Sequence, residues 1–300
     1  MIVITGATGN TGRVAAEALL AKGGKVRVIG RDSKKLHSLT QKGAEAFVGN
    51  VEDAASMTKA FEGAKAIYLV IPQSHTVEDL RAYQDRIADS FVSAVAAARV
   101  PFVVTLSSIG AQHSEGTGPI VGLHFLEEKL NRIAGLNVLH LRPAQFMENL
   151  LMNIQPLRTM GVLPGGAKGD LASPWIATKD IGAYAAPRLA ACDFKGVSTQ
   201  ELLGPRDVTM NEIASIIGNA IGKPKLSYTQ VPFLMLGPAI ASMGIPKKTG
   251  DLLIEMMKAG NSGLLNPQEA RSQENTTPTT IESFATEVFA PAYAGKTATA

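Results

Sequence analysis

A glycine-rich turn near the start of the chain constrains the fold more strongly than any other feature of the sequence. Residues 4–12 read ITGATGNTG, so Gly6, Gly9 and Gly12 recur every three residues between an apolar run and a helical segment. Gly6 can adopt the positive φ of a sharp turn, Gly9 lets the backbone approach a ligand, and Gly12 lets the helix pack against the strand. Amides at the start of that helix would attract an anionic oxygen. The turn therefore indicates a phosphate-binding site, and the alternative is a structural turn without a ligand.

Short apolar runs alternate with helical segments over the first half of the chain. Most of these runs are apolar nearly throughout, as in strands that are covered on both faces. The clearest helical pattern covers residues 77–99, where one apolar stripe is interrupted only by Gln84. Right-handed connections between such units give an α/β fold with a parallel, doubly wound sheet. The predicted strands are residues 2–5, 25–30, 45–50, 66–72, 102–108 and 137–143.

The alternation changes beyond Leu150. Two polar, glycine-bearing loops follow the fifth predicted strand and the sixth, at residues 111–119 and 163–174. Both are long enough to act as lids over a binding site. Farther along, Thr209 and Glu212 have the spacing of a capping box, which predicts the start of a helix there.

Composition excludes several classes of function. The 29 basic and 26 acidic residues are spread along the chain, so no basic patch indicates a nucleic-acid partner. No apolar run approaches the roughly 18 to 20 residues that cross a bilayer, so no membrane partner is expected. Cys192 is the single cysteine, and the chain opens on a strand pattern without signal-peptide features, which together predict a cytoplasmic protein. No spacing of His, Cys or carboxylate residues indicates a metal site.

Four motifs together resemble the NmrA-like group of atypical short-chain dehydrogenases/reductases, which includes quinone oxidoreductase-like proteins. They are TGATGNTG, GRDSKKL, GNVED and LRPAQFMENLL, and the resemblance covers residues 1–235. It implies a Rossmann domain that binds NAD(P) and a small α/β C-terminal part that binds the substrate. We expect the Rossmann domain at residues 1–155 with later returning segments, the smaller part at 156–290, a flexible tail at 291–300, and a monomer or homodimer.

Charge after the second predicted strand favours NADP(H) over NAD(H). Where an NAD enzyme offers a carboxylate to the ribose 2′-hydroxyl, this chain has Arg31, followed by Lys34 and Lys35. A guanidinium can bind a 2′-phosphate through two parallel hydrogen bonds, and a nearby ammonium adds charge. Asp32 leaves an alternative open, because its carboxylate could face the ribose instead.

The remaining candidate contacts follow the carboxyl ends of the other predicted strands, where open α/β sheets bind their ligands. In GNVED the family commonly carries Asp where this chain has Asn50, so the contact to adenine is expected with altered polarity. The predicted cofactor-binding residues are Gly6, Thr8, Gly9, Asn10, Thr11, Gly12, Arg31, Lys35, Asn50, Val51, Ile71, Pro72, Gln73, Ser107, Pro143 and Phe146.

The resemblance also implies a Tyr-x-x-x-Lys pair on a helix, and the tyrosine is missing here. One register places Ile120 and His124 at the pair, and another places Phe125 and Lys129 there. We predict that His124 handles the proton, because an imidazole changes charge near neutral pH. Glu128, four residues farther along, could orient it. The alternatives are a histidine that only binds the ribose, or one that only pairs with Glu128.

Aromatic and methionine side chains in the second half predict an apolar pocket for a flat acceptor. The sequence thus favours an NADPH-dependent reductase of a hydrophobic quinone, carbonyl or conjugated small molecule. The alternative is a non-catalytic NADP(H) sensor, which the missing tyrosine favours. The predicted pocket residues are Phe146, Met147, Met152, Met160, Trp175, Phe233 and Met235.

Overall fold

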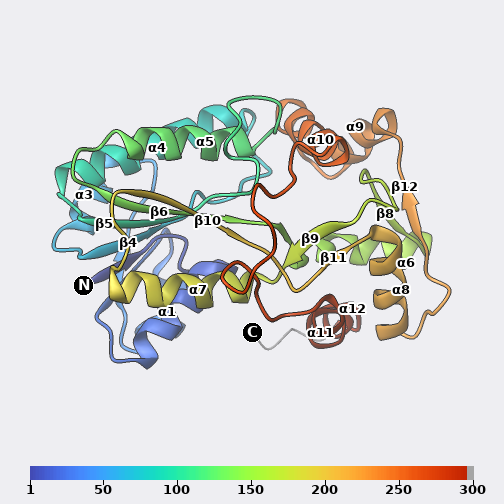
Figure 1. The fold of residues 1–300 in the computed structure, drawn as a ribbon, viewed down its shortest axis with the longest axis horizontal. Helices are drawn as coiled ribbons and strands as arrows, with labels where there is room; N and C mark the ends of the chain where they lie inside the picture. The colour runs from blue at the N-terminus through green and yellow to red at the C-terminus, as the bar shows by residue number, and fades with distance from the viewer. Residues whose placement is uncertain (296–300) are drawn as a thin grey trace.

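Seven parallel strands form the central sheet of the computed structural model, which describes residues 1–295. Their order is β10-β6-β5-β4-β1-β2-β3, and every neighbouring pair is parallel. Figure 1 labels strands β4, β5, β6 and β10 of this sheet. This arrangement confirms the predicted Rossmann-type sheet and all six predicted strands. The strands are β1 (Ile2–Ile4), β2 (Val26–Gly30), β3 (Glu45–Val48), β4 (Ala66–Leu69), β5 (Phe102–Leu106), β6 (Asn137–Pro143) and β10 (Val197–Leu202).

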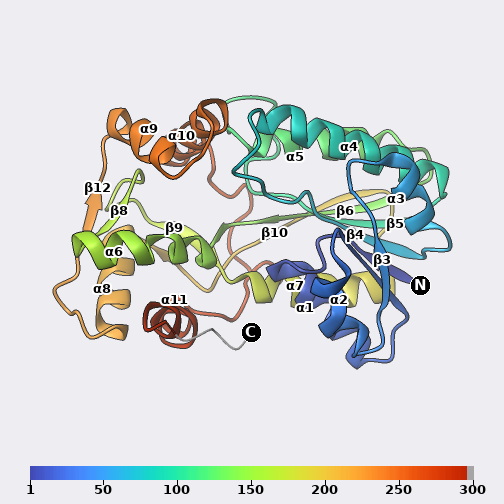
Figure 2. The same ribbon diagram turned by 180° about the vertical axis from the view of Figure 1, so that it is seen from behind.

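Helices cover both faces of this sheet, as Figures 1 and 2 show from opposite sides. Helices α3, α4 and α5 bury Met57, Phe91 and Leu126 against one face. Helices α1, α2 and α7 bury Leu36 and Leu189 with their neighbours against the other. Strands enclosed in this way need apolar side chains on both faces, which explains their nearly continuous apolar sequences. The helices are α1 (Asn10–Ala21), α2 (Ser33–Thr40), α3 (Ala54–Phe61), α4 (Leu80–Ala97), α5 (Ile120–Asn131) and α7 (Thr178–Ala191).

Small mixed sheets and further helices form the second part of the molecule. Strands β7 (Gln145–Phe146), β9 (Ser173–Ile176) and β11 (Asp207–Val208) make one sheet, and β8 (Leu163–Gly165) pairs with β12 (Tyr228–Gln230). The predicted capping box is confirmed, since Thr209 and Glu212 exchange both bonds at the start of α8. The other helices are η1 (Met147–Asn153, 3₁₀), α6 (Ile154–Met160), α8 (Met210–Ala220), α9 (Phe233–Ser242), α10 (Lys247–Ser262), α11 (Ile281–Phe284), η2 (Ala285–Phe289, π) and α12 (Ala290–Tyr293).

The two parts are interleaved along the chain. Helix α7 and strand β10 lie within the residues expected for the smaller part, yet they pack on α1 and extend the main sheet beside β6. Residues 264–280 then run from α10 along the end of β10 to α11 (Figure 1). Within this segment, the Asn275 carbonyl accepts from the Leu203 amide at 2.7 Å, and the Thr277 amide donates to the Leu203 carbonyl at 2.8 Å.

The expected tail at 291–300 begins inside α12, and residues 296–300 lie outside the described part of the chain. Among residues 1–295, no helix combines the length and the apolar character that a membrane span requires.

Candidate cofactor and catalytic site

The glycine turn after β1 is closely packed, and two of its glycines are sterically required. Gly6 has φ +61°, and the amide of Gly9 donates to the Gly6 carbonyl at 2.9 Å. A Cβ on Gly12 would lie 2.4 Å from the Gly6 oxygen, which is closer than atoms can approach. A Cβ on Gly9 would lie 3.3 Å from the same oxygen, a much milder contact. Gly6 and Gly12 therefore shape the turn, whereas Gly9 leaves its outer side open.

Helix α1 begins at this turn without a side-chain cap. Gly9 is its N-cap, no side chain of residues 1–295 caps it, and no acidic residue lies in the first turn. Thr8, Gly9 and Asn10 are exposed, whereas Thr11 is buried. Uncapped amides at the positive end of a helix dipole are the donors that bind phosphate in Rossmann folds. The turn thus fits the pyrophosphate of a dinucleotide, with Thr8 and Asn10 better placed than Thr11 to add side-chain donors.

The end of β2 carries positive charge. Arg31 and Lys35 are exposed, and neither makes an ion pair within residues 1–295. Asp32 caps helix α2, since its carboxylate accepts from the Lys34 amide at 2.9 Å. A ribose at Asp32 would have to share that carboxylate with the helix, whereas a 2′-phosphate at Arg31 would displace no protein partner.

The ends of β3 and β4 offer a polar contact and two apolar ones. Asn50 is exposed, and its Oδ1 accepts from the Glu52 amide at 3.2 Å. Val51 and Ile71 are each 9% exposed, so each offers only a small apolar surface at this edge of the sheet. The other predicted contacts at the end of β4, Pro72 and Gln73, are half-buried and exposed, respectively.

A buried polar network lies at the ends of β5 and β6. The Ser107 hydroxyl donates to Glu127 Oε1 at 2.5 Å. Arg142 binds the same carboxylate through two bonds, Nε to Oε1 at 3.0 Å and Nη2 to Oε2 at 2.5 Å. Glu127 is a member of this network that the sequence patterns above did not predict. A signal was present, because Glu127 has the helical spacing of Leu123 and Leu130, which puts a carboxylate on the apolar face of α5.

His124 lies one helical turn before Glu127 and is half-buried. Its Nδ1 donates to the Ala111 carbonyl at 2.8 Å, so in the neutral imidazole Nε2 is the atom that can take up a proton. The expected partner Glu128 instead faces Arg132 at 3.5 Å. The i, i+4 spacing on a helix allows Glu128 to contact either His124 or Arg132, and in the structure it pairs with Arg132.

Lys129, the lysine of the other register, pairs with Asp89 of α4 at 2.5 Å. The lysine is therefore engaged in an ion pair between α4 and α5, and it sits beside Leu130, which is buried in the core.

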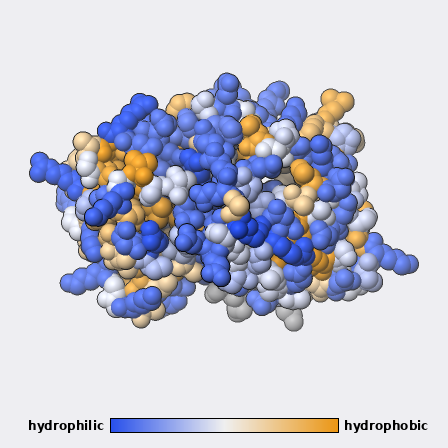
Figure 3. All heavy atoms as spheres, viewed as in Figure 1, coloured by the Kyte–Doolittle hydropathy of each residue, from blue (hydrophilic) through white to orange (hydrophobic). Residues whose placement is uncertain are grey.

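The expected apolar pocket residues differ widely in exposure. Met147 and Trp175 are core residues of the smaller part, at 1% and 5% exposure, whereas Met152, Met160 and Met235 are exposed. Figure 3 shows apolar side chains scattered over the face it presents. A methionine pattern cannot tell core from surface, because it gives no information on which face another element covers.

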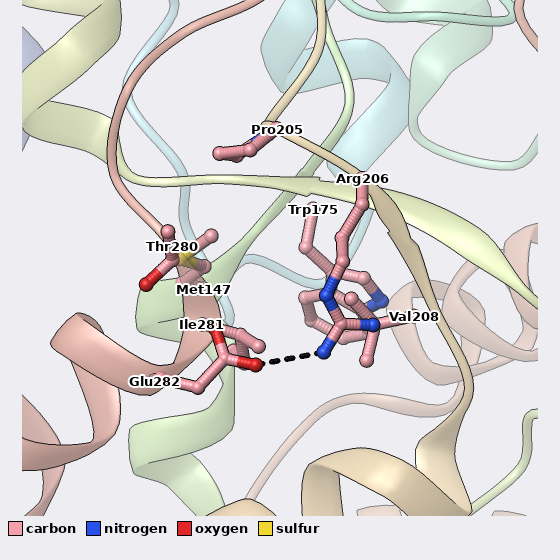
Figure 4. A pocket seen from close by; sticks show the side chains of 8 residues that line it. All are labelled: Met147, Trp175, Pro205, Arg206, Val208, Thr280, Ile281 and Glu282. Carbon is pink, nitrogen blue, oxygen red and sulfur yellow. Dashed lines mark hydrogen bonds and ion pairs between the residues drawn. The ribbon is translucent and has the colours of Figure 1, made fainter.

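Beside Met147 and Trp175 lies a cavity of about 40 Å³. Figure 4 shows Arg206 and Glu282 joined across it by an ion pair of 2.7 Å. A space this small holds water at most, so it is a packing gap and not an acceptor site.

Pro143 and Phe146 complete the placement of the predicted contacts. Pro143 is buried at the end of β6, and Phe146 is half-buried in β7. The sheet order brings the ends of β1 to β6 to one edge, so the predicted contacts that follow these strands share that edge. Within residues 1–295, no cluster of His, Cys, Asp or Glu could hold a metal ion.

Residues 1–285 match the model of the NmrA-like family. The chain belongs to the NmrA-like family. Quinone oxidoreductase 2 of Escherichia coli is 28% identical to it over 287 residues, or 93% of this chain and 95% of the relative. The NAD(P)H azoreductase of Xenophilus azovorans is 25% identical over 260 residues, or 85% of this chain and 86% of the relative.

A solved structure extends the likeness of this NmrA-like chain to the fold. The NADPH-dependent quinone oxidoreductase of Escherichia coli, complexed with NADPH, superposes with a TM-score of 0.78 at 25% identity. The match covers 96% of this chain and 100% of that one. This chain thus resembles NAD(P)H-dependent reductases along most of its length.

Proposed function

We propose that this protein binds NADP(H) and reduces a hydrophobic quinone, carbonyl or conjugated small molecule by hydride transfer. The observation that carries the proposal is the open glycine turn at the start of α1, with Arg31, which makes no ion pair within residues 1–295, at the same sheet edge. The quinone oxidoreductase and azoreductase relatives support the choice of a reductase.

The glycine turn, the basic residues after β2 and His124 each have a defined part in this proposal. The amides of the glycine turn and α1 bind the pyrophosphate, and Arg31 with Lys35 binds the 2′-phosphate. NADPH, when bound, supplies the hydride. His124 is held through Nδ1 by the Ala111 carbonyl, and a protonated Nε2 gives its proton to the reduced substrate.

Replacing Arg31 tests the choice of dinucleotide. We expect Arg31→Ala to weaken NADPH binding by about 10- to 100-fold, because a charge-assisted bidentate contact is lost. NADH binding should stay nearly unchanged. Arg132→Ala removes the same charge from an exposed helical site far along the chain and serves as the control. Equal losses for NADPH and NADH would refute the assignment of Arg31 to the 2′-phosphate.

Turnover with a panel of quinones, enones and azo dyes tests the chemistry. We expect acceptor-dependent oxidation of NADPH, and a kcat about 100-fold lower in His124→Ala. Glu128→Ala is the matched control, because Glu128 lies on the same helix and pairs with Arg132 instead. An unchanged rate in His124→Ala would remove the acid role from this residue.

A non-catalytic NADP(H) sensor is the second candidate, and two observations on α5 favour it. Helix α5 has no tyrosine, and the lysine of one register is engaged with Asp89. Tight NADPH binding without acceptor-dependent oxidation of any compound in the panel would favour the sensor and contradict the reductase.

A further inference from the structure

Ser107, Glu127 and Arg142 form a hydrogen-bonded network at the edge of the sheet where the predicted cofactor contacts lie. Ser107 follows β5 at the carboxyl edge of the sheet, Glu127 lies on α5, and Arg142 lies on β6. Both Ser107 and Glu127 are 4% exposed. Arg142 also reaches Gln268, through Nη1 to Oε1 at 3.5 Å. A carboxylate that is bound on both oxygens by a guanidinium and is reached by a hydroxyl is firmly fixed in place.

A second hydrogen-bonded network involves the same two strands, two residues farther from their carboxyl ends, and it differs from the first. Thr105 Oγ1 contacts His140 Nδ1 at 2.8 Å, and His140 Nε2 contacts Asn131 Oδ1 at 2.9 Å. Thr105 lies on β5, two residues before Ser107, and is 0% exposed. Both ring nitrogens of this histidine have partners, so this network is closed and structural. The outer network instead ends in Ser107, which follows β5 at the carboxyl edge of the sheet and is 4% exposed.

The direction of the Ser107 hydrogen bond follows from its partner. An ionised carboxylate has no hydrogen to give, and Arg142 donates to both of its oxygens. Ser107 must therefore donate its proton to Glu127, and its oxygen is left with lone pairs only. Toward any ligand at the sheet edge, Ser107 is a hydrogen-bond acceptor.

The order of the strands indicates which half of a bound dinucleotide would lie near the Ser107 hydroxyl oxygen. The glycine turn after β1 lies at the middle of the sheet, with β2 and β3 on one side and β4, β5 and β6 on the other. Arg31 and Asn50, the residues expected at the adenosine half, follow β2 and β3. A dinucleotide bound across the turn therefore puts its nicotinamide half toward β5. The donors of that half are the ribose hydroxyls and the carboxamide, and the carboxamide is its one N–H donor.

We propose that Glu127 is a positioning residue, which with Arg142 holds Ser107 as the acceptor for the nicotinamide carboxamide N–H. This inference rests on the proposed binding of NADP(H). It assigns Glu127 no contact with the cofactor, since it acts through Ser107 alone.

The 3-acetylpyridine analogue of NADP⁺ tests this assignment by binding alone, because it keeps the carbonyl and replaces the amide nitrogen with a methyl group. We expect the wild-type protein to bind NADP⁺ about fivefold more tightly than the analogue, the value of one neutral hydrogen bond. Ser107→Ala and Glu127→Gln should each reduce this preference to nearly one. The double variant should show no further change, because both substitutions remove the same interaction.

Asp180→Asn is the matched control for removing a buried carboxylate charge. Asp180 is 7% exposed on α7 and accepts from the amide and the hydroxyl of Thr279, which has no bond to Ser107, Arg142 or Gln268 within residues 1–295. This variant should keep the wild-type preference. If Glu127→Gln fails to fold, Ser107→Ala still tests the acceptor role, since it leaves the ion pair of Glu127 intact.

The outcomes separate this inference from the proposed function. A wild-type protein that binds neither dinucleotide would overturn both. If the wild-type protein binds both NADP⁺ and the analogue, and Ser107→Ala keeps the same preference for NADP⁺, the inference is overturned while the proposed function stands. A preference lost in Ser107→Ala but kept in Glu127→Gln would overturn the positioning role of Glu127.

Discussion

Replacing Gly12 with alanine tests the glycine turn most directly. The new Cβ would lie 2.4 Å from the Gly6 oxygen and 2.8 Å from the Gly6 carbonyl carbon. Both are backbone atoms, so relief requires α1 to move away from the turn. That movement is opposed by α7, where a Cβ on Gly182 would already lie 2.5 Å from the Thr11 carbonyl oxygen. Overpacking of this kind costs about 1–3 kcal/mol, and we expect Gly12→Ala to lower the free energy of unfolding by about 2 kcal/mol.

The same variant should lose affinity for the dinucleotide, because the first amides of α1 move with the helix. We expect NADPH to bind roughly tenfold more weakly or worse, as measured by titration calorimetry beside urea unfolding. Gly9→Ala separates packing from binding. Its φ of −90° suits alanine and its Cβ meets only the Gly6 oxygen at 3.3 Å, so stability should change by less than about 0.5 kcal/mol.

A phosphate close to the Gly9 backbone would still be displaced by the new methyl group. Gly9→Ala should therefore weaken NADPH by roughly tenfold without loss of stability. The reasoning is refuted if Gly12→Ala is as stable as the wild-type protein. Unchanged affinity of Gly9→Ala for NADPH would show that no phosphate binds close to Gly9 in this turn.

Three further predictions concern stability. Burial lowers the pKa of His140 from 6.5 to about 4, so the unfolded chain takes up a proton that the folded one excludes. The stabilisation is complete above pH 6.5 and declines between pH 6.5 and 4 by about 3 kcal/mol, and urea unfolding of His140→Gln across this range should lack that decline. Thr209→Ala removes the cap of α8 and should cost about 1 kcal/mol in the same assay. Gly118→Ala puts a Cβ at a φ of +60° against the Leu252 carbonyl oxygen, and should lower the thermal midpoint by several degrees, as calorimetry would show.

The sheet and its glycine turn were predictable because local sequence specifies them. Apolar runs of strand length, separated by helical spacing, describe a parallel sheet whatever lies around it. Gly12 is equally local, since the clash that excludes a side chain there is with Gly6, six residues earlier. The capping box at Thr209 depends on residues three positions apart, so it too could be identified without the fold.

Choices between distant elements could not be predicted in this way. Glu127 and Glu128 are adjacent acids on one helix, and the sequence alone favoured Glu128 as the partner of His124. The phase of α5 against β5 and β6 decides otherwise, since it turns Glu127 toward Ser107 and Arg142 and leaves Glu128 with Arg132. The same holds for Met147 and Met152, five residues apart, of which one is buried and the other exposed.

The buried network also narrows what can replace the missing tyrosine in the proposed reaction. A hydroxyl whose proton is committed to Glu127 cannot protonate a substrate oxygen, so Ser107 is excluded as the acid while the network is intact. Lys129 is engaged with Asp89, which leaves His124 with its Nε2 as the candidate acid on α5. An acid supplied by one half-buried imidazole suits acceptors whose reduced form is already a stabilised anion, because they need little protonation in the transition state. Quinones meet that condition better than simple ketones, and a ratio of quinone to ketone turnover that rises in His124→Ala would bear this out.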